Sequence, residues 1–336
     1  MPTLFGKKYT KREMLQRVGD MAQLADAREM ELSSGRGRGV RVIEVSNGTG
    51  LRFSVLPDRG MDIVWAEYRG IPISFYAKAG VTSPYFFSNE DYMKNFFGGL
   101  LTTGGLTYMG AKCVDEGQAL GLHGRVNSLP AADVSVSKAW DGEDYVLRVR
   151  GQVEESRLYG EKMVLTREIT TRMGENIILL RDTVENQSFT PQPLMMLYHF
   201  NFGFPLVDDG TTFHTSCTEH LPRDEQSKVG LAHYEKLGSP TPGFLENVFY
   251  HSGGPREGFG EVVNPALGLR VRVTFDTEQL PILNQWKLLG EGDYVLGIEP
   301  GTWRVEGRAE ARRQGALIYL NPLETKVFEL AVRIQG

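Results

Sequence analysis

The chain has 336 residues, of which 41% are hydrophobic and 24% are charged, a composition typical of a soluble globular protein. Its formal net charge is −5 with both signs interspersed, which argues against nucleic acid or an anionic membrane surface as a partner. No apolar run reaches the roughly 18 residues of a membrane span, and the N-terminus has no secretory-signal pattern. Because only two cysteines occur, we expect a cytoplasmic protein. The charge balance favours a small molecule as the ligand, and a homodimer is left open.

The first predicted element is an N-terminal helix over residues 10–25. Thr10 and Glu13 have the spacing of a capping box, in which each side chain bonds a free backbone amide of the first turn. Hydrophobic residues then recur at helical spacing, at Met14, Leu15, Val18, Met21 and Leu24. We expect this helix, with the loop up to residue 38, to cover the core of the domain.

Beyond Gly39 the hydrophobic pattern changes to a period of two in short segments, which predicts β-strands. Such segments occur at Val40/Val42, Phe53/Val55, Tyr145/Leu147/Val149, Met163/Leu165 and Val271/Val273/Phe275. Turn signals separate them, and no regular alternation with helices appears. The sequence therefore predicts one all-β domain over residues 1–336, with a large antiparallel β-sandwich or barrel over 39–336. Within it, 222–260 is expected to be an irregular excursion or a small hairpin lobe.

Three titratable residues occur where burial would be unfavourable without a partner or a function. His123 lies in a short segment flanked by glycines, His199 lies in the apolar run 194–205, and Glu299 follows the apolar run 294–298. Burying such a group without a hydrogen bond costs roughly 1–3 kcal/mol. A turn histidine, a core histidine and a carboxylate bonded to turn amides would each explain one of them, so these settings alone leave structural and functional interpretations open.

The order of these motifs resembles the aldose 1-epimerase (galactose mutarotase) superfamily. A His-Gly pair at 123–124, an aromatic-flanked His-x-Asn at 199–201 and a glutamate at a strand end near the C-terminus carry the resemblance. The segments Leu56-Pro-Asp-Arg-Gly-Met-Asp-Ile63, Gly104-Gly-Leu and Leu283-Asn-Gln-Trp-Lys287 are more similar to an uncharacterised bacterial branch, the DUF4432-like proteins. The resemblance covers roughly residues 40–335 and implies the galactose mutarotase-like supersandwich.

The resemblance also implies that a sugar ring is opened and closed by acid–base chemistry, with no cofactor. In that chemistry His199 gives a proton to the ring oxygen, while Glu299 takes one from the anomeric hydroxyl. His123 is then a hydrogen-bonding partner that steadies charge at the ring oxygen. An imidazole and a desolvated carboxylate can be tuned towards similar pKa values, which suits proton transfer in both directions.

Several positions concern sugar binding. Better-known mutarotases have a second glycine where this chain has Arg125, an asparagine where it has Tyr198, and a binding arginine in the segment that here reads Gly98-Gly-Leu-Leu-Thr-Thr-Gly-Gly105. Sugars need hydrogen-bond forks for vicinal hydroxyls and an aromatic face, so we expect substrate-binding residues at Arg59, Asp62, Arg125, Gln285, Trp286 and Lys287. An ion pair within a turn would also explain Arg59 and Asp62, and a core position would explain Trp286. The run 83–98 holds six aromatic residues and is expected to form a sugar-stacking lip or a packed loop.

Two metal hypotheses follow from the histidines. The segment 214–220 reads His-x-x-Cys-x-x-His, which offers only three ligands at unhelpful spacing, so we predict no zinc site there. His123, His199 and Glu299 could themselves hold a divalent ion, as an aldose–ketose isomerase would require. The sequence therefore predicts a mutarotase or related epimerase acting on a free or modified aldose. A metal-dependent isomerase and a non-catalytic sugar-binding or sensing domain are the alternatives.

Overall fold

Two large antiparallel sheets make up most of this computed structural model, which describes residues 1–87 and 91–336. The first sheet has eight strands, in the spatial order β11 (Ala132–Asp141), β12 (Asp144–Ser156), β13 (Lys162–Arg172), β14 (Ile177–Asn186), β25 (Thr325–Gln335), β21 (Leu269–Asp276), β20 (Glu257–Asn264) and β17 (Thr212–Thr215). The second has eleven, in the order β18 (Glu219–Pro222), β19 (Asn247–Ser252), β22 (Ile282–Leu289), β23 (Tyr294–Gly301), β16 (Leu197–Gly203), β8 (Leu101–Gly104), β6 (Asp62–Tyr68), β5 (Leu51–Leu56), β4 (Arg41–Ser46) and β3 (Asp26–Glu31), with β7 (Ile71–Pro72) paired to β6. The predicted all-β architecture is confirmed.

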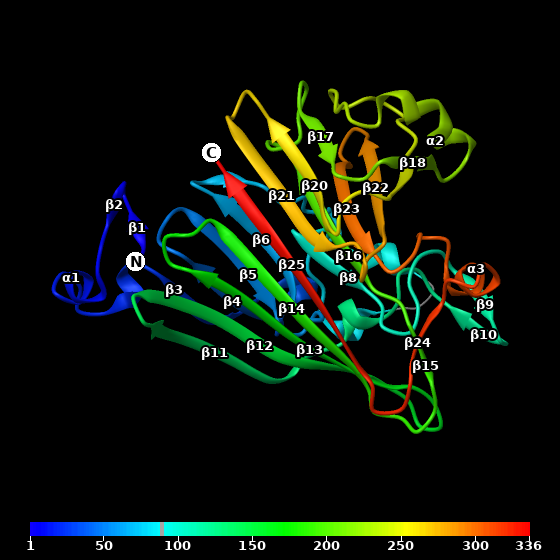
Figure 1. The fold of residues 1–336 in the computed structure, drawn as a ribbon, viewed down its shortest axis with the longest axis horizontal. Helices are drawn as coiled ribbons and strands as arrows, with labels where there is room; N and C mark the ends of the chain where they lie inside the picture. The colour runs from blue at the N-terminus through cyan, green and yellow to red at the C-terminus, as the bar shows by residue number, and fades with distance from the viewer. Residues whose placement is uncertain (88–90) are drawn as a thin grey trace.

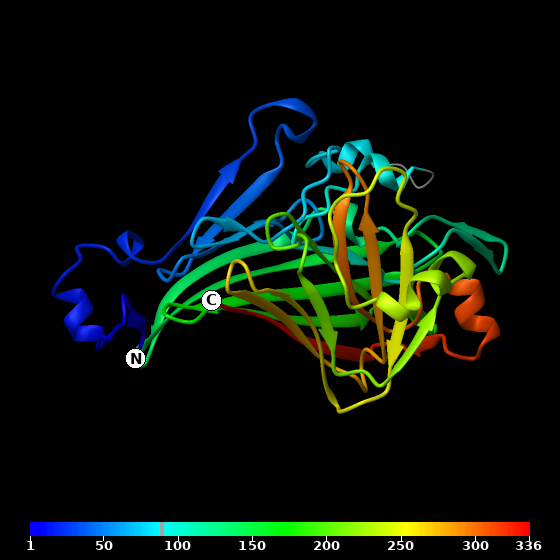
Figure 2. The same ribbon diagram turned by 90° about the horizontal axis from the view of Figure 1, so that it is seen from above.

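The two sheets pack face to face, and Figure 2 shows β11 to β14 curving along the length of the molecule. Facing side chains of both sheets form one hydrophobic cluster, which includes Phe53 and Ile63 from the second sheet and Val149, Val271 and Phe328 from the first. The period-two pattern expected for half-buried strands is clear in β21, where every second residue is buried. Burial of one face of each sheet therefore fixes the sandwich.

The remaining elements are short and lie around the sandwich. Three two-stranded sheets pair β1 (Thr3–Leu4) with β2 (Lys7–Lys8), β9 (Cys113–Asp115) with β10 (Gln118–Leu120), and β15 (Gln192–Leu194) with β24 (Ile318–Leu320). The helices are α1 (Lys11–Leu15), α2 (Glu225–Gly230) and α3 (Arg308–Arg313), and Figure 1 shows α1 and α3 at opposite ends of the molecule. The 222–260 excursion carries α2 between β18 and β19, so it extends one end of the second sheet.

The N-terminal helix is much shorter than the predicted 10–25. Its capping box is present, because the Glu13 backbone N–H donates to Thr10 Oγ1 at 3.2 Å and the Thr10 backbone N–H donates to Glu13 Oε2 at 2.8 Å. The helix nevertheless ends at Leu15, and a separate 3₁₀ turn spans Met21–Gln23. The Asp20 side chain caps the N-terminus of that turn, so a new helical turn begins there. The helix is therefore broken although the hydrophobic spacing continues.

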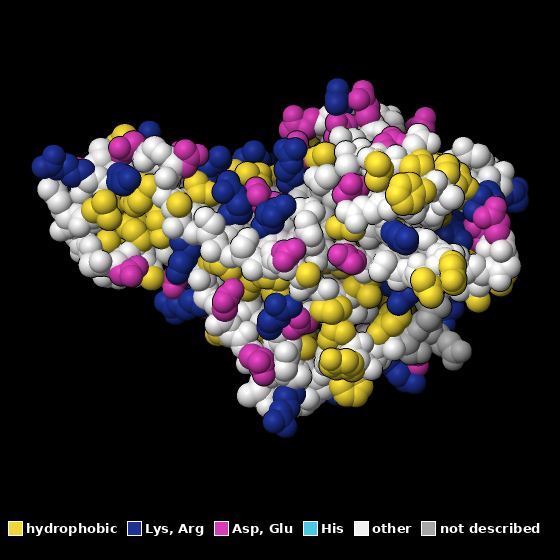
Figure 3. Space-filling view, turned by 90° about the horizontal axis from the view of Figure 1, so that it is seen from below, with side chains coloured by type: hydrophobic (Ala, Val, Ile, Leu, Met, Phe, Trp, Pro, Cys, Tyr) yellow, Lys and Arg dark blue, Asp and Glu magenta, His cyan; other side chains and the backbone are white. Residues whose placement is uncertain are grey.

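The surface and the helix lengths agree with the composition. On the face seen in Figure 3, Lys and Arg side chains are interspersed with Asp and Glu. Within residues 1–87 and 91–336, the longest α-helix has six residues, and none is long and apolar enough to cross a membrane.

Candidate active site

Strands β16 and β23 place His199 and Glu299 opposite each other in the second sheet. Their antiparallel register pairs Phe200 with Ile298. His199, which precedes Phe200, is therefore opposite Glu299, which follows Ile298. Phe200 and Ile298 belong to the core between the sheets, and side chains alternate along a strand. His199 and Glu299 therefore point to the other face of this sheet, where His199 Nε2 lies 3.2 Å from Glu299 Oε1.

Both members of this pair are buried, and burial works against charge on each of them. Desolvation raises the pKa of Glu299 well above its ordinary value, and the Glu246 carboxylate raises it further. Desolvation lowers the pKa of His199 well below its ordinary value, and the nearby His123 lowers it further. The contact of 3.2 Å does not have hydrogen-bond geometry, so Glu299 Oε1 has no hydrogen-bond partner in the described part of the chain, and neither has His199 Nδ1. Buried polar atoms are normally bonded, so these free atoms suggest a ligand.

His123 joins the pair from a turn rather than a strand. Its φ is +56°, and the turn is held because its N–H donates to the Gly110 carbonyl at 2.8 Å and its carbonyl accepts from the Gly105 N–H at 3.0 Å. Its ring centroid lies 5.6 Å from that of His199, and burial lowers the pKa of His123 to about 4. The structure thus brings all three predicted catalytic residues together.

These three side chains line one cavity of about 150 Å³. Its other polar lining comes from Arg223 and Glu246. Its apolar walls include Tyr92, Phe96, Leu122, Val248, Trp286 and Val305. The ring centroids of Phe96 and Trp286 both lie 5.5 Å from that of His199. An apolar cavity with a few convergent polar groups is the usual form of a small-molecule site.

Sequence reasoning missed Arg223 and Glu246. Arg223 contacts Glu246 at 2.9 Å, and the Trp286 indole N–H donates to the other Glu246 oxygen at 3.0 Å. These residues flank the irregular segment between β18 and β19, and only the pairing of β19 with β22 brings them to the cavity. Tyr92 and Phe96 belong to the aromatic run 83–98, whose residues 88–90 lie outside the described residues.

Of the predicted substrate-binding residues, Trp286 lines the cavity, whereas its neighbours on β22 point to the opposite face. Gln285 Oε1 lies 3.0 Å from the His251 Nε2 atom. The Lys287 ammonium group donates to the His233 carbonyl at 3.1 Å, and burial lowers the pKa of Lys287 to about 8. Both side chains therefore have roles in packing β22 rather than in the cavity.

Arg59 is buried away from the cavity and ties loops together. Its guanidinium donates to the carbonyl oxygens of Asn127 at 2.7 Å, Thr82 at 2.8 Å and Asn95 at 3.0 Å. It thus anchors the aromatic run that supplies part of the cavity wall. The side chain of Arg125 is not part of the cavity lining, and its backbone N–H donates to the Gly105 carbonyl at 3.0 Å.

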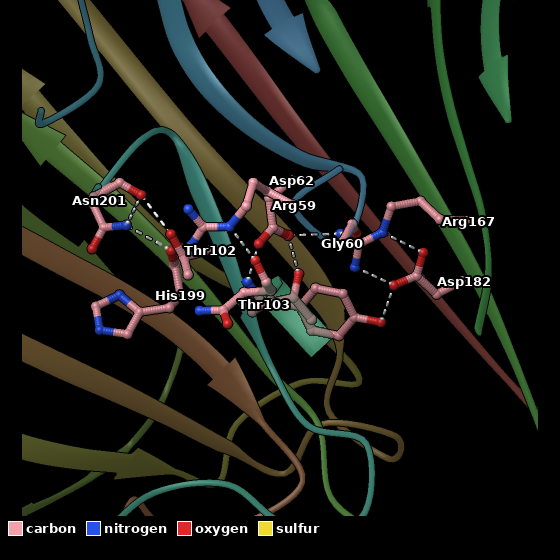
Figure 4. A network of polar contacts seen from close by, with 12 residues as sticks. Arg59, Gly60, Asp62, Thr102, Thr103, Arg167, Asp182, His199 and Asn201 are labelled. Carbon is pink, nitrogen blue, oxygen red and sulfur yellow. Dashed lines mark hydrogen bonds and ion pairs between the residues drawn. The ribbon is translucent and has the colours of Figure 1, made fainter. Parts of the chain in front are cut away.

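Asp62 lies in a buried ionic network between the sheets. It accepts from the Thr103 hydroxyl at 2.6 Å and contacts Arg167 at 2.9 Å, while Arg167 also pairs with Asp182 at 2.6 Å. Figure 4 shows this network running from Asp182 to the strand that carries His199, whose imidazole lies at its far end. The side chains of Arg59 and Asp62 therefore form no ion pair with each other among the described residues, and the Asp62 backbone N–H donates to the Arg59 carbonyl at 3.1 Å.

Neither set of candidate metal ligands has the arrangement of a metal site in the part of the chain that the structure describes. No group of three or more His, Cys, Asp or Glu side chains within residues 1–87 and 91–336 is arranged to hold a metal ion. In the segment 214–220, His220 instead lies against His251, with their Nδ1 atoms 2.8 Å apart, and Tyr234 Oη lies 3.1 Å from His220 Nε2.

Several solved structures have the same fold, and their names are those of the superfamily that the sequence resembles. A candidate aldose 1-epimerase from Klebsiella pneumoniae is 26% identical with a TM-score of 0.88, over 94% of this chain and 86% of that one. A galactose mutarotase-like protein from Clostridium acetobutylicum is 14% identical with a TM-score of 0.66, over 94% and 99%. Galactose 1-epimerase from Lactobacillus acidophilus is 14% identical with a TM-score of 0.60, over 93% and 99%. These likenesses agree with the sandwich described above.

A comparison with curated proteins found no match. A protein-family model does match, over residues 37–334, which is most of the chain. Its boundaries include all three residues of the candidate catalytic site and both large sheets, apart from β3 and the last residue of β25. The chain therefore belongs to the family described as a domain of unknown function, DUF4432.

Proposed function

We propose that this protein is an aldose 1-epimerase that interconverts the anomers of a free or modified aldose. The observation that carries the proposal is the buried contact of 3.2 Å between His199 and Glu299, with unpartnered polar atoms on both. A pair of proton-transfer groups within reach of one small cavity is the minimum that ring opening needs. His123 supports the proposal because its unpartnered Nδ1 belongs to the same cavity lining.

The pKa directions suggest how the pair works. Because burial disfavours charge on both groups, the resting pair is neutral, with a protonated Glu299 carboxyl group and an uncharged His199 imidazole. Transfer of that proton to His199 gives the roles expected from the resemblance, with His199 as acid and Glu299 as base. Glu299 then takes the proton of the anomeric hydroxyl while His199 protonates the ring oxygen. The bond from C1 to the ring oxygen breaks as the C1 carbonyl forms, and closure after rotation about C1–C2 reverses both transfers.

The proposal is tested by measuring anomer equilibration across a sugar panel, by polarimetry or saturation-transfer NMR. We expect Glu299→Gln and His199→Asn each to lower kcat by about 10²- to 10⁴-fold, the usual contribution of general acid–base catalysis. Exposed Glu329→Gln, on the first sheet, is the matched control for loss of a carboxylate. Equal rates in wild type and both site variants would contradict the proposal, whereas sugar binding without turnover would indicate a sugar-binding domain.

A further inference from the structure

The sheet face that carries His199 and Glu299 continues across β22 to β19. Strand registers pair Glu299 with Asn284 and Asn284 with Tyr250, so these three side chains form one row on one face. Neighbouring strands are about 4.8 Å apart, which puts the backbone of Tyr250 about 10 Å from that of Glu299. One sugar ring with a substituent can span this distance. Val248 and Val305 connect the two ends, because they line the cavity and also pack in one cluster with Tyr250.

Three hydrogen-bond donors gather at the Tyr250 end without a partner in the described part of the chain. They are Tyr250 Oη, Trp303 Nε1 and Arg304 Nε, and all three atoms are buried. The guanidinium carbon of Arg304 lies 5.3 Å from the Tyr250 ring centroid and 5.5 Å from that of Trp303. Burial raises the pKa of Tyr250 far above its ordinary value, so the phenol keeps its proton. A ligand that satisfies these donors must bring acceptors.

Arg304 is also the cation at this end without an ion pair. Arg223 is held by Asp224 at 2.8 Å and by Glu246 at 2.9 Å. Among residues 1–87 and 91–336 the Arg304 guanidinium forms no ion pair, and its Nε atom has no hydrogen-bond partner. The charge of Arg304 opposes the rise that burial causes in the pKa of Glu306. A guanidinium with free donors in a partly buried site binds carboxylate and phosphate oxygens through charge-assisted hydrogen bonds.

We propose that Tyr250, Trp303 and Arg304 form an anion subsite beside the catalytic pair, so that the substrate is an aldose carrying a carboxylate or phosphate group. This inference rests on the proposed function, because the catalytic pair fixes the position of the anomeric carbon. Between the two ends, Asn284 Oδ1 is a buried acceptor without a partner, which suits a ring hydroxyl. A neutral hydroxyl brings one acceptor to the three donors, whereas an oxyanion brings two or three.

The test compares mutarotation of glucose, glucuronate and glucose 6-phosphate by the wild type and Arg304→Gln. We expect kcat/KM to be at least about 10-fold higher for one of the two anionic sugars than for glucose. Arg304→Gln should lower that anionic kcat/KM by about 10- to 100-fold, mainly through KM, because hydrogen bonds to a charged group are lost. The rate on glucose should change less than about two-fold. A preference for glucuronate would indicate recognition of a carboxylate, and a preference for glucose 6-phosphate would indicate recognition of a phosphate.

Matched variants separate recognition from folding. Exposed Arg181→Gln, on the first sheet, removes the same charge and should leave both substrate classes unchanged. Arg304→Lys keeps the positive charge but removes the planar guanidinium, and Tyr250→Phe keeps the aromatic ring but removes the hydroxyl donor. Each should weaken only the anionic sugar, so the inference remains testable even where Arg304→Gln lowers the melting temperature. Equal losses on glucose and on the anionic sugars in these variants would overturn the subsite.

A binding arm distinguishes failure of the subsite from failure of the proposed function. Calorimetric titration of Glu299→Gln with glucuronate and glucose 6-phosphate measures recognition without turnover. Binding that depends on Arg304, with no mutarotation in the wild type, supports the subsite and removes the epimerase proposal. Mutarotation of glucose with no anionic preference, and no Arg304-dependent binding, removes the subsite and retains the epimerase proposal.

Discussion

Glu299 and His199 lie 3.2 Å apart in a buried setting that disfavours charge on both side chains. Desolvation is the first cause of both pKa shifts, and it outweighs the attraction that a contact of 3.2 Å would give to an ion pair. Because the buried carboxyl group of Glu299 has a raised pKa, the folded state is less stable at neutral pH than it would be with a neutral isostere at this position. Function at a buried site commonly has such a stability penalty.

This penalty leads to a prediction for Glu299→Gln. The folded-state pKa of Glu299 is raised from 4.5, so above pH 4.5 the folded chain retains a proton that the unfolded chain releases. The stability contributed by that group is present below pH 4.5 and is lost as pH rises through the folded pKa. We therefore expect Glu299→Gln to melt at a higher temperature than the wild type at pH 7, with a difference that shrinks towards pH 4.5. Thermal melts of both proteins across this range check it.

Exposed Glu329→Gln controls for the loss of a carboxylate as such. A glutamine variant that is less stable than the wild type at pH 7 would mean that Glu299 is held by favourable interactions, against the burial argument.

At the scale of strands, the sequence located the three candidate catalytic residues but not the rest of the cavity. The apolar runs around His199 and Glu299 predicted buried strands, and the register of β16 with β23 brings the two together. The substrate-binding expectations at Gln285 and Lys287 did not account for alternation along β22, which turns both away from Trp286. A sequence shows which residues share a strand face, but the choice of face depends on the opposing sheet.

Strand β23 has a glycine, Gly297, whose absent side chain leaves room for the Glu299 carboxyl group. A Cβ at Gly297 would collide with Glu299 Oε1 and would lie 2.9 Å from Trp286 Cβ. We expect Gly297→Ala to lower kcat/KM by at least about 10-fold while the chain stays folded, because overpacking typically costs about 1–3 kcal/mol. Anomer-equilibration rates and a thermal melt measure the two effects.

Gly290→Ala is the control on the same hairpin, because its nearest contact would be the Asp293 carbonyl at 3.4 Å. Equal losses of activity in the two alanine variants would show that the effect does not depend on the position of the Glu299 carboxylate.

At the scale of the whole molecule, period-two hydrophobicity was enough to predict an antiparallel sandwich or barrel, and the family resemblance favoured the sandwich. The hydrophobic pattern was not enough for the N-terminal segment, where the hydrophobic spacing of 10–25 continues across a break that Asp20 caps. It also could not predict the links between the sheets, because Arg167 and Asp62 are more than 100 residues apart and neither lies in a pattern that marks a buried ion pair. Such contacts depend on the packing of the sheets against each other.

Arg167 forms a fully buried charged link between the two sheets. From β13 it bonds Asp182 on the neighbouring strand β14 and Asp62 on β6 of the opposite sheet, and all three side chains are fully buried. Burial raises the pKa of Asp62 to about 6 even with the guanidinium beside it. Removing only the arginine would leave two buried carboxylates without their cation, which is far less favourable than replacing a whole buried network.

We therefore expect Arg167→Met to lower the free energy of unfolding by about 3–5 kcal/mol at pH 7, measured by urea denaturation. The loss should be smaller at pH 5, because the pKa of Asp62, raised to about 6 by burial, lets this carboxylate take up a proton in the folded state. Adding Asp62→Asn and Asp182→Asn should recover part of the lost stability. Exposed Arg181→Met should cost at most about 1 kcal/mol. A loss that is the same at both pH values and unaffected by the asparagine changes would mean that Arg167 stabilises the sandwich through packing rather than charge.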